Sequence, residues 1–133
     1  MYCASFTDTV IDHFNSPRNC RNMENADAVG SYGDAECGDS LRIFLKVKNE
    51  VIEEISFLVV GCVAAVASSS MTTELAKGKT ITEALEITNE DIANALGGLP
   101  ENKMHCSVLG AGALRNAIKN YQYQASIRKK FMN

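Results

Sequence analysis

Three features that define common functional classes are missing from this sequence. No apolar stretch approaches the roughly 20 residues of a membrane-spanning helix, because glycine, serine and threonine interrupt the longest runs. No basic excess is present either, and the net charge of −3 argues against nonspecific binding of nucleic acid. The N-terminus has neither the basic region nor the apolar core of a secretory signal, so we expect a cytoplasmic protein.

Closely spaced cysteine pairs are also missing, although cysteine itself is not. The 133 residues include five cysteines but no Cys-x-x-Cys pair, which is a common local signature of a metal site. Cytoplasmic thiols stay reduced, and a chain with 46% hydrophobic residues can form its core without disulfides. We therefore expect a single domain, residues 1–133, in which some of the thiols carry chemistry.

A β-hairpin is the clearest local prediction. Apolar residues alternate with mostly polar ones over residues 41–48, as expected for a strand with one buried face. Asn49-Glu50 allows a tight turn, and residues 52–60 return as a second strand. Before the hairpin, residues 29–36 indicate a weak, glycine-interrupted strand or loop.

Helical patterns lie on both sides of the hairpin. Apolar residues recur at helical spacing over residues 6–14 and again over 109–121, and residues 63–77 are rich in small, helix-compatible side chains. Thr80 and Thr88 each begin a capping-box pattern, which predicts two short helices between the longer ones.

Polar residues inside two of these helices are given no catalytic role. We expect His13 to be a surface or capping residue. Residues 68–70 are three consecutive serines that lack the Gly-x-Ser-x-Gly turn of a nucleophilic serine. We therefore expect these serines to be tolerated in the packing of the helix, with exposed hydroxyls and no catalytic role.

Three cysteines lie where one predicted element meets the next. Cys37-Gly38-Asp39 precedes the hairpin, Cys62 follows its second strand, and His105-Cys106 opens the last helix. A thiolate at such a boundary is held at its base and free at its tip, which suits a soft metal or a persulfide. The partial positive charge of a helix N-terminus would also favour the thiolate form of Cys62. Spacing alone leaves a metal site and plain packing equally open, and for Cys3 and Cys20 we expect packing or plain exposure.

The order of several motifs makes the chain resemble the IscU/NifU-type iron-sulfur cluster assembly scaffolds. These motifs cover almost the whole chain and are residues 10–19 (VIDHFNSPRN), Cys37-Gly38-Asp39, Gly61-Cys62 with 67–70, 77–79 (KGK) and 103–107 (KMHCS). The resemblance implies an α+β fold of the SufE/NifU type, in which a small three-stranded antiparallel sheet is covered by helices. It also implies a scaffold that is not an enzyme, on which a labile iron-sulfur cluster (2Fe-2S) is assembled before transfer to apo-proteins.

The same resemblance assigns roles to individual residues. Cys37, Cys62 and Cys106 would hold the cluster, with Asp39 or His105 in the fourth position, and Cys106 would accept the persulfide sulfur. Three thiolates with one oxygen or imidazole ligand would leave the cluster labile, whereas four thiolates would hold it too firmly for transfer.

Partners follow from the resemblance as well. A cysteine desulfurase would supply sulfur, a ferredoxin-type donor would supply electrons, and apo iron-sulfur proteins would receive the cluster. Residues 99–103 (LPENK) depart from the segment that dedicated chaperones recognise, so a chaperone partner is not expected. The oligomeric state stays open between monomer, dimer and trimer. Gly110-Ala111-Gly112 replaces a helix-favouring stretch, and we expect the start of the last helix to fray.

A zinc protein is the alternative from another class. Three cysteines with one further ligand also make a tetrahedral zinc site, either structural or with an open position for hydrolysis. The sequence lacks the His-Glu-x-x-His pattern that would give a zinc hydrolase its base. A thiol redox switch built on Cys106 beside His105 is a further alternative.

Overall fold

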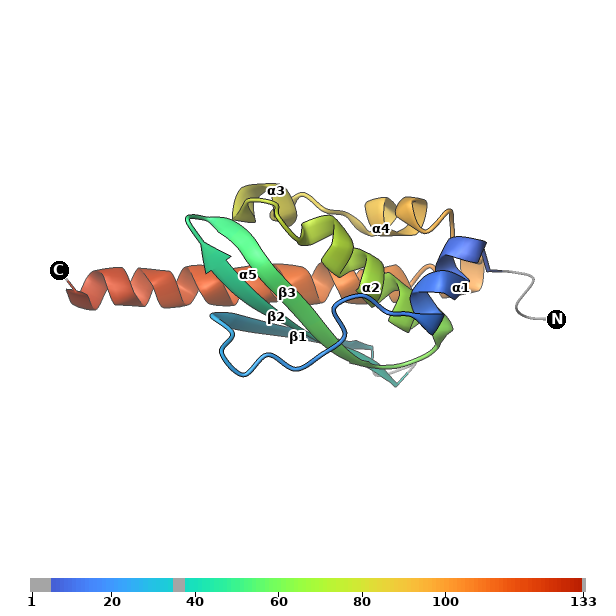
Figure 1. Cartoon of the computed structure of the whole chain (residues 1–133), viewed down its shortest axis with the longest axis horizontal. Coiled ribbons are helices and arrows are strands. Elements are labelled where there is room, and N and C mark those ends of the chain that lie inside the picture. The colour runs from blue at the N-terminus through green and yellow to red at the C-terminus, as the bar shows by residue number, and fades with distance from the viewer. Residues whose placement is uncertain (1–5, 35–37, 133) are drawn as a thin grey trace.

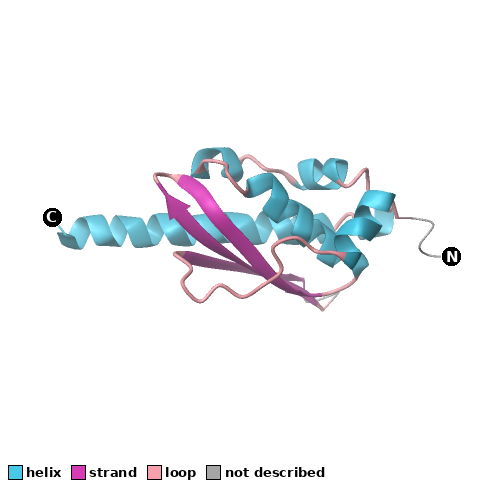
Figure 2. Cartoon of the chain, viewed as in Figure 1, coloured by secondary structure: helices cyan, strands magenta, loops and turns pink. Residues whose placement is uncertain are grey.

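A three-stranded antiparallel sheet lies at the centre of the computed structural model, which describes residues 6–34 and 38–132. The strands are β1 (Ala28–Asp34), β2 (Asp39–Lys48) and β3 (Val51–Val60), adjacent in chain order (Figures 1 and 2). The α+β fold with three strands is thus confirmed. Of the stretch predicted as a weak strand or loop, residues 29–34 belong to β1, which pairs with β2 along its whole length, and residues 35–36 lie outside the described residues.

Two long helices pack against the sheet. Helix α5 (Cys106–Met132) contacts β1 and β2, and α2 (Val63–Ala76) contacts β3. In Figure 1, α5 passes behind the strands and continues beyond them toward the C-terminus. The remaining helices are α1 (Asp8–Asn15), α3 (Ile81–Leu85), α4 (Asn89–Ala95) and the 3-10 helix η2 (Glu101–Lys103). Among the described residues, no helix combines the length and apolar character needed to cross a bilayer.

The local predictions for the hairpin and the short helices are confirmed. Asn49 and Glu50 both have positive φ angles, 54° and 64°, as the two central residues of a tight hairpin turn between β2 and β3 require. Thr80 and Thr88 each cap a helix through a reciprocal capping box. These features depend on neighbours in sequence, which is why the sequence alone predicts them.

Glycines allow α5 to lie unusually close to its neighbours. A Cβ atom added at Gly30 of β1 would lie 2.0 Å from the backbone nitrogen of Ala117, and one at Gly110 would lie 2.1 Å from Thr72 Oγ1 of α2. At Gly112 it would meet the ring of Tyr32 at 2.4 Å. The prediction that the two α5 glycines cause fraying is therefore replaced by a packing role, and α5 is continuous from Cys106.

The free edge of β1 is covered by α5. Asn116 Nδ2 donates to the carbonyl of Ser31 at 2.8 Å, and the backbone N–H of Val29 donates to Asn120 Oδ1 at 3.2 Å. These bonds occupy backbone groups that would otherwise be open to strand pairing with another chain. They also fix which face of α5 is turned toward the edge of the sheet.

His13 and the three serines of α2 are buried, so the expected surface position of His13 and the expected exposed serine hydroxyls are wrong, whereas the serines are accommodated in packing as expected. Residues 68–70 have no exposed surface, and the His13 ring lies against α2. Ser70 Oγ accepts from the backbone N–H of Arg18 at 2.9 Å and lies 2.8 Å from His13 Nδ1, to which its hydroxyl can therefore donate. Burial, and then the charge of Arg18, lower the pKa of His13. The neutral ring thus ties α1 to α2.

Candidate metal and cluster site

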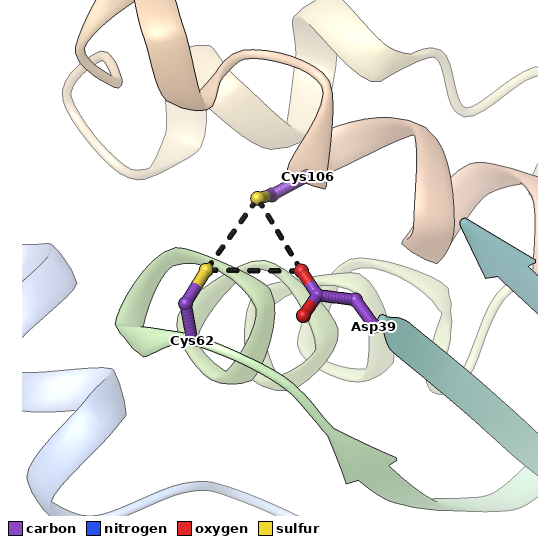
Figure 3. Close-up of side chains that lie close together, drawn as sticks. All are labelled: Asp39, Cys62 and Cys106. Carbon is purple, nitrogen blue, oxygen red and sulfur yellow. Dashed lines mark hydrogen bonds between the residues drawn. The ribbon is translucent and has the colours of Figure 1, made fainter. Parts of the chain in front are cut away.

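Asp39, Cys62 and Cys106 converge at one end of the sheet from three separate elements (Figure 3). The sulfur atoms of Cys62 and Cys106 lie 3.7 Å apart. Asp39 Oδ2 lies 3.8 Å from the sulfur of Cys62 and 4.0 Å from that of Cys106. Residues up to 67 positions apart in sequence thus present two thiols and a carboxylate to one point.

These separations suit a shared metal ion. Thiolates bound at about 2.3 Å to a tetrahedral metal lie about 3.8 Å from one another along the edges of the tetrahedron. The observed sulfur-to-sulfur distance of 3.7 Å is close to that edge. Small movements of the Asp39 carboxylate would bring its oxygen into the same shell.

Asp39 is the first residue of β2 and is only 7% exposed. Its carboxylate lies against Gly61, where an added Cβ would come within 2.9 Å of Asp39 Cγ and Oδ1. Any larger residue at Gly61 would push the carboxylate away from the two sulfurs. The glycine that precedes Cys62 therefore serves the neighbouring ligand, a role that its place in the sequence does not reveal.

Cys62 occupies the N-cap of α2 with extended backbone angles, φ −80° and ψ 179°. Its side chain makes no capping hydrogen bond to the helix, and the first turn of α2 holds no acidic residue. The sulfur is directed instead toward Asp39 and Cys106 (Figure 3). The partial positive charge of the helix N-terminus favours an anionic sulfur at this position.

Cys106 is the first residue of α5 and is fully buried. The approach to the helix is held by Met104, whose carbonyl accepts from the backbone N–H of Ser107 at 3.1 Å and from its hydroxyl at 2.7 Å. His105 Nε2 lies 3.7 Å from the sulfur of Cys106, so the imidazole is within reach of the same site.

The two thiols and the carboxylate favour binding of a cation. Burial, the neighbouring Cys62 and the charge of Asp39 together raise the pKa of the Cys106 thiol from 9.0 to about 12, while Lys103 acts in the opposite direction. Ionising both thiols beside the Asp39 carboxylate would place three negative charges within about 4 Å of one another, where they repel strongly. A divalent cation would relieve this repulsion, and its binding would release the Cys106 proton.

The structure describes some of the predicted site residues and leaves others outside the described ranges. Asp39, Cys62 and Cys106 come together as expected, and His105 adjoins them. Cys37 and Cys3 lie outside the described residues, so the predicted role of Cys37 stays a prediction. Cys20 is exposed and bridges to β3, away from this group, as its lack of flanking motifs predicted.

A groove of about 430 Å³ lies on the exposed face of the sheet, at the same end of the strands as Asp39. Two of its lining residues, Ser40 and Val60, are the chain neighbours of Asp39 and Gly61. Val60 and Leu58 are 69% and 40% exposed. The complete lining is Ser31, Tyr32, Gly33, Ser40, Leu41, Arg42, Leu58, Val59 and Val60. Because side chains alternate along a strand, the exposed Ser40 and Arg42 of this groove lie on the face of β2 opposite to the buried Asp39 carboxylate.

Comparisons with known proteins find relatives over most of the chain. The family model described as the NifU-like N terminal domain matches residues 5–128. The chain is 57% identical over 116 residues to an iron-sulfur cluster assembly scaffold protein IscU of Archaeoglobus fulgidus, covering 87% of this chain and 76% of that protein. It is 49% identical to the iron-sulfur cluster assembly protein IscU of Plasmodium falciparum, covering 89% and 74%. A NifU-like N-terminal structure from Brucella abortus, 17% identical, superposes with a TM-score of 0.72 over 92% of this chain and 97% of that one, and so supports the fold.

Proposed function

Since the chain belongs to the family of NifU-like N-terminal domains, we propose that it is a scaffold on which a labile iron-sulfur cluster is assembled before transfer to apo-proteins. The observation that carries this proposal is the convergence of Asp39, Cys62 and Cys106, with 3.7 Å between the two sulfur atoms. Its relatives from Archaeoglobus fulgidus and Aquifex aeolicus are named as scaffold proteins for this assembly. The cluster is therefore cargo, and we propose no catalytic turnover by the chain itself.

The donor set fits a cluster that must be given away. We propose that Cys37, Cys62 and Cys106 bind a two-iron, two-sulfur cluster and that Asp39 or His105 completes the shell. Of these two, Asp39 faces both sulfurs directly, at 3.8 and 4.0 Å. An oxygen ligand holds iron less firmly than a thiolate, which leaves one corner of the cluster open to exchange.

Iron entry would change the state of Cys106. Without metal, the pKa near 12 keeps this residue a thiol, which is a poor nucleophile. A ferrous ion held by Cys62 and Asp39 would place positive charge within about 4 Å and favour the thiolate. We therefore expect iron to bind before sulfur arrives.

Sulfur transfer would then proceed from a cysteine desulfurase. The Cys106 thiolate would attack the outer sulfur of the desulfurase persulfide, the sulfur-sulfur bond of that persulfide would break, and the desulfurase thiolate would leave. Two electrons from a ferredoxin-type donor would reduce the new persulfide on Cys106 to sulfide and thiolate.

The test is anaerobic reconstitution with ferrous iron, cysteine and a desulfurase, followed by visible absorption. We expect a chelator-labile, red-brown chromophore in the wild type and in Cys20→Ser, a control that alters an exposed cysteine outside the site. We expect Cys62→Ser and Cys106→Ser to lose most of it, and Cys37→Ser to show whether the third cysteine belongs to the site. Equal chromophore yield in Cys62→Ser and Cys106→Ser would overturn the proposal.

The zinc alternative is separated by the same experiment. A sulfur-to-sulfur distance of 3.7 Å suits zinc as well as iron, so zinc binding alone would identify the ligands and leave the cargo undecided. Zinc carries no visible absorption, whereas a cluster does. Tight zinc binding without any chromophore under reconstitution would therefore favour the zinc protein.

A further inference from the structure

Acidic residues are confined to the part of the chain that precedes α5. All 16 acidic residues occur at or before Glu101, while α5 carries five basic residues and no acidic one. The five are Arg115, Lys119, Arg128, Lys129 and Lys130. Basic residues near a helix C-terminus suit the helix dipole, but the dipole does not account for the absence of acids over the whole helix.

The second half of α5 extends past the strands (Figure 1). It also exposes large apolar side chains. Tyr123, Ile127 and Phe131 are 66%, 36% and 78% exposed. Their spacing of four residues places them along one side of the helix. This is the side that, one to two turns earlier, turns Asn116 and Asn120 toward the edge of β1.

Basic residues border this apolar row on both sides. At about 100° per residue, Lys130 lies about 60° to one side of Ile127 and Arg128 about 100° to the other. We call the row of Tyr123, Ile127 and Phe131 with Arg128 and Lys130 the distal α5 surface. Its chemistry is an apolar centre inside a positive border.

We propose that the distal α5 surface docks a protein partner whose own surface has acidic residues around an apolar centre. A symmetric pairing of two copies through this surface is disfavoured, because it would bring the arginines and lysines of both helices together with no acidic residue between them. Charge complementarity thus favours a different, acidic protein.

The size of the surface favours a transient contact. Residues 120–131 span only about 18 Å of one helix, whereas a stable complex buries roughly 800 Å² per partner, usually contributed by about 20 to 30 residues. Ile127 also lies 21 residues after Cys106, or about 32 Å along the helix. A partner held there would leave Cys62, Cys106 and Asp39 open to a second protein. This inference stands on α5 alone and does not require the proposed function.

The test uses a defined probe, a short helical peptide with a row of leucines four residues apart bordered by glutamates. In amide NMR spectra of the whole chain, we expect the peptide to shift residues 119–131. Affinity should fall at least about tenfold between 0.02 and 0.3 M salt, because exposed charges are screened. The same peptide with lysines in place of the glutamates should produce no shift.

Matched variants separate a docking surface from general attraction. Arg128→Glu with Lys130→Glu should abolish the shifts, whereas Lys77→Glu with Lys79→Glu, which changes the same charge at exposed lysines outside α5, should leave them. Ile127→Gln with Phe131→Gln should weaken binding at least about fivefold if the apolar row contributes. Binding that ignores the apolar substitutions would overturn the proposal.

Two other occupants would also overturn it. Self-association in sedimentation velocity that Ile127→Gln with Phe131→Gln removes would assign the surface to a second copy. Binding to phosphatidylglycerol vesicles without binding to the acidic peptide would assign it to an anionic membrane surface. Absence of any shift with the acidic peptide would show that the surface docks no such partner.

Discussion

The two halves of α5 use different residues for different tasks. The half that begins at Cys106 is buried and built from small side chains, with Arg115 its one charged residue. The half after Lys119 is exposed, basic and aromatic. One half fixes a sulfur atom against its partner ligands, and the other reaches away from the sheet. The difference shows how one helix can combine a rigid site with an accessible surface.

Rigidity in the first half comes from close approach. Gly110 and Gly112 let α5 touch α2 and the ring of Tyr32 without intervening side chains, and Gly30 lets the backbone of β1 meet that of α5. Because the Cys62 and Cys106 sulfurs belong to α2 and α5, their spacing of 3.7 Å depends on how these helices pack. Adding one methyl group at these contacts would therefore change the spacing of the two sulfurs.

Gly30→Ala should have the largest effect on this packing. Its new Cβ would fall 2.0 Å from the backbone nitrogen of Ala117, which cannot rotate away. We expect a loss of about 3 kcal/mol or more in the free energy of unfolding, measured by urea denaturation. Gly33→Ala is the matched control in the same strand, because its Cβ would meet nothing closer than 3.6 Å. Equal losses in both variants would show that close approach is not the cause.

Gly110→Ala should have the next largest effect, on stability and metal affinity together. Its Cβ would lie 2.1 Å from Thr72 Oγ1, which donates to the carbonyl of Ser68. We expect a loss of about 1 to 3 kcal/mol in stability and weaker binding of Co²⁺, followed by its thiolate absorption.

A second substitution shows whether the contact with α2 is responsible. Thr72→Ala removes the clashing oxygen and should restore part of both losses in Gly110→Ala, whereas Thr72→Ser keeps the oxygen and should restore neither. If Thr72→Ala gives no recovery, helix propensity at Gly110 and not packing would explain the result.

The buried state of Cys106 predicts a pH dependence of smaller size. Its pKa is raised to about 12, so below that pH the metal-free protein carries a proton on this sulfur. A divalent cation must displace that proton, so affinity should rise with pH by about tenfold per unit for this group, or about 1.4 kcal/mol. Co²⁺ titrations from pH 6 to 8 should show this contribution to the slope of log affinity against pH. In Cys106→Ser the slope should be smaller by one, because one proton fewer is released. An unchanged slope in the variant would place the released proton elsewhere.

The sequence predicts what neighbouring residues determine and misses what distant residues determine. The hairpin turn at Asn49-Glu50 and the caps at Thr80 and Thr88 are local and were predicted. His13 was expected at the surface because its partner, Ser70, lies 57 positions away. Gly30 suggested a weak strand because no local pattern reveals the backbone of Ala117 against it.

The candidate site was predicted only in part, for the same reason. Element boundaries drew attention to Cys62 and Cys106, but spacing alone left a metal site and packing equally open. Resemblance to a family supplied the set of residues, and the fold then brought Asp39 to both sulfurs. The role of Gly61 became visible only from the carboxylate that lies against it.

Identical substitutions in the two halves of α5 test the comparison most directly, and the smallest effect is expected in the second half. Ile118→Ala removes a fully buried side chain and should cost about 2 to 5 kcal/mol in unfolding free energy. Ile127→Ala alters a side chain that is 36% exposed on the protruding half and should cost about 0.5 kcal/mol or less. Urea denaturation of both variants would measure the difference. A comparable loss at Ile127 would mean that the far half is packed in solution, and the division between a fixed half and an accessible half would not hold.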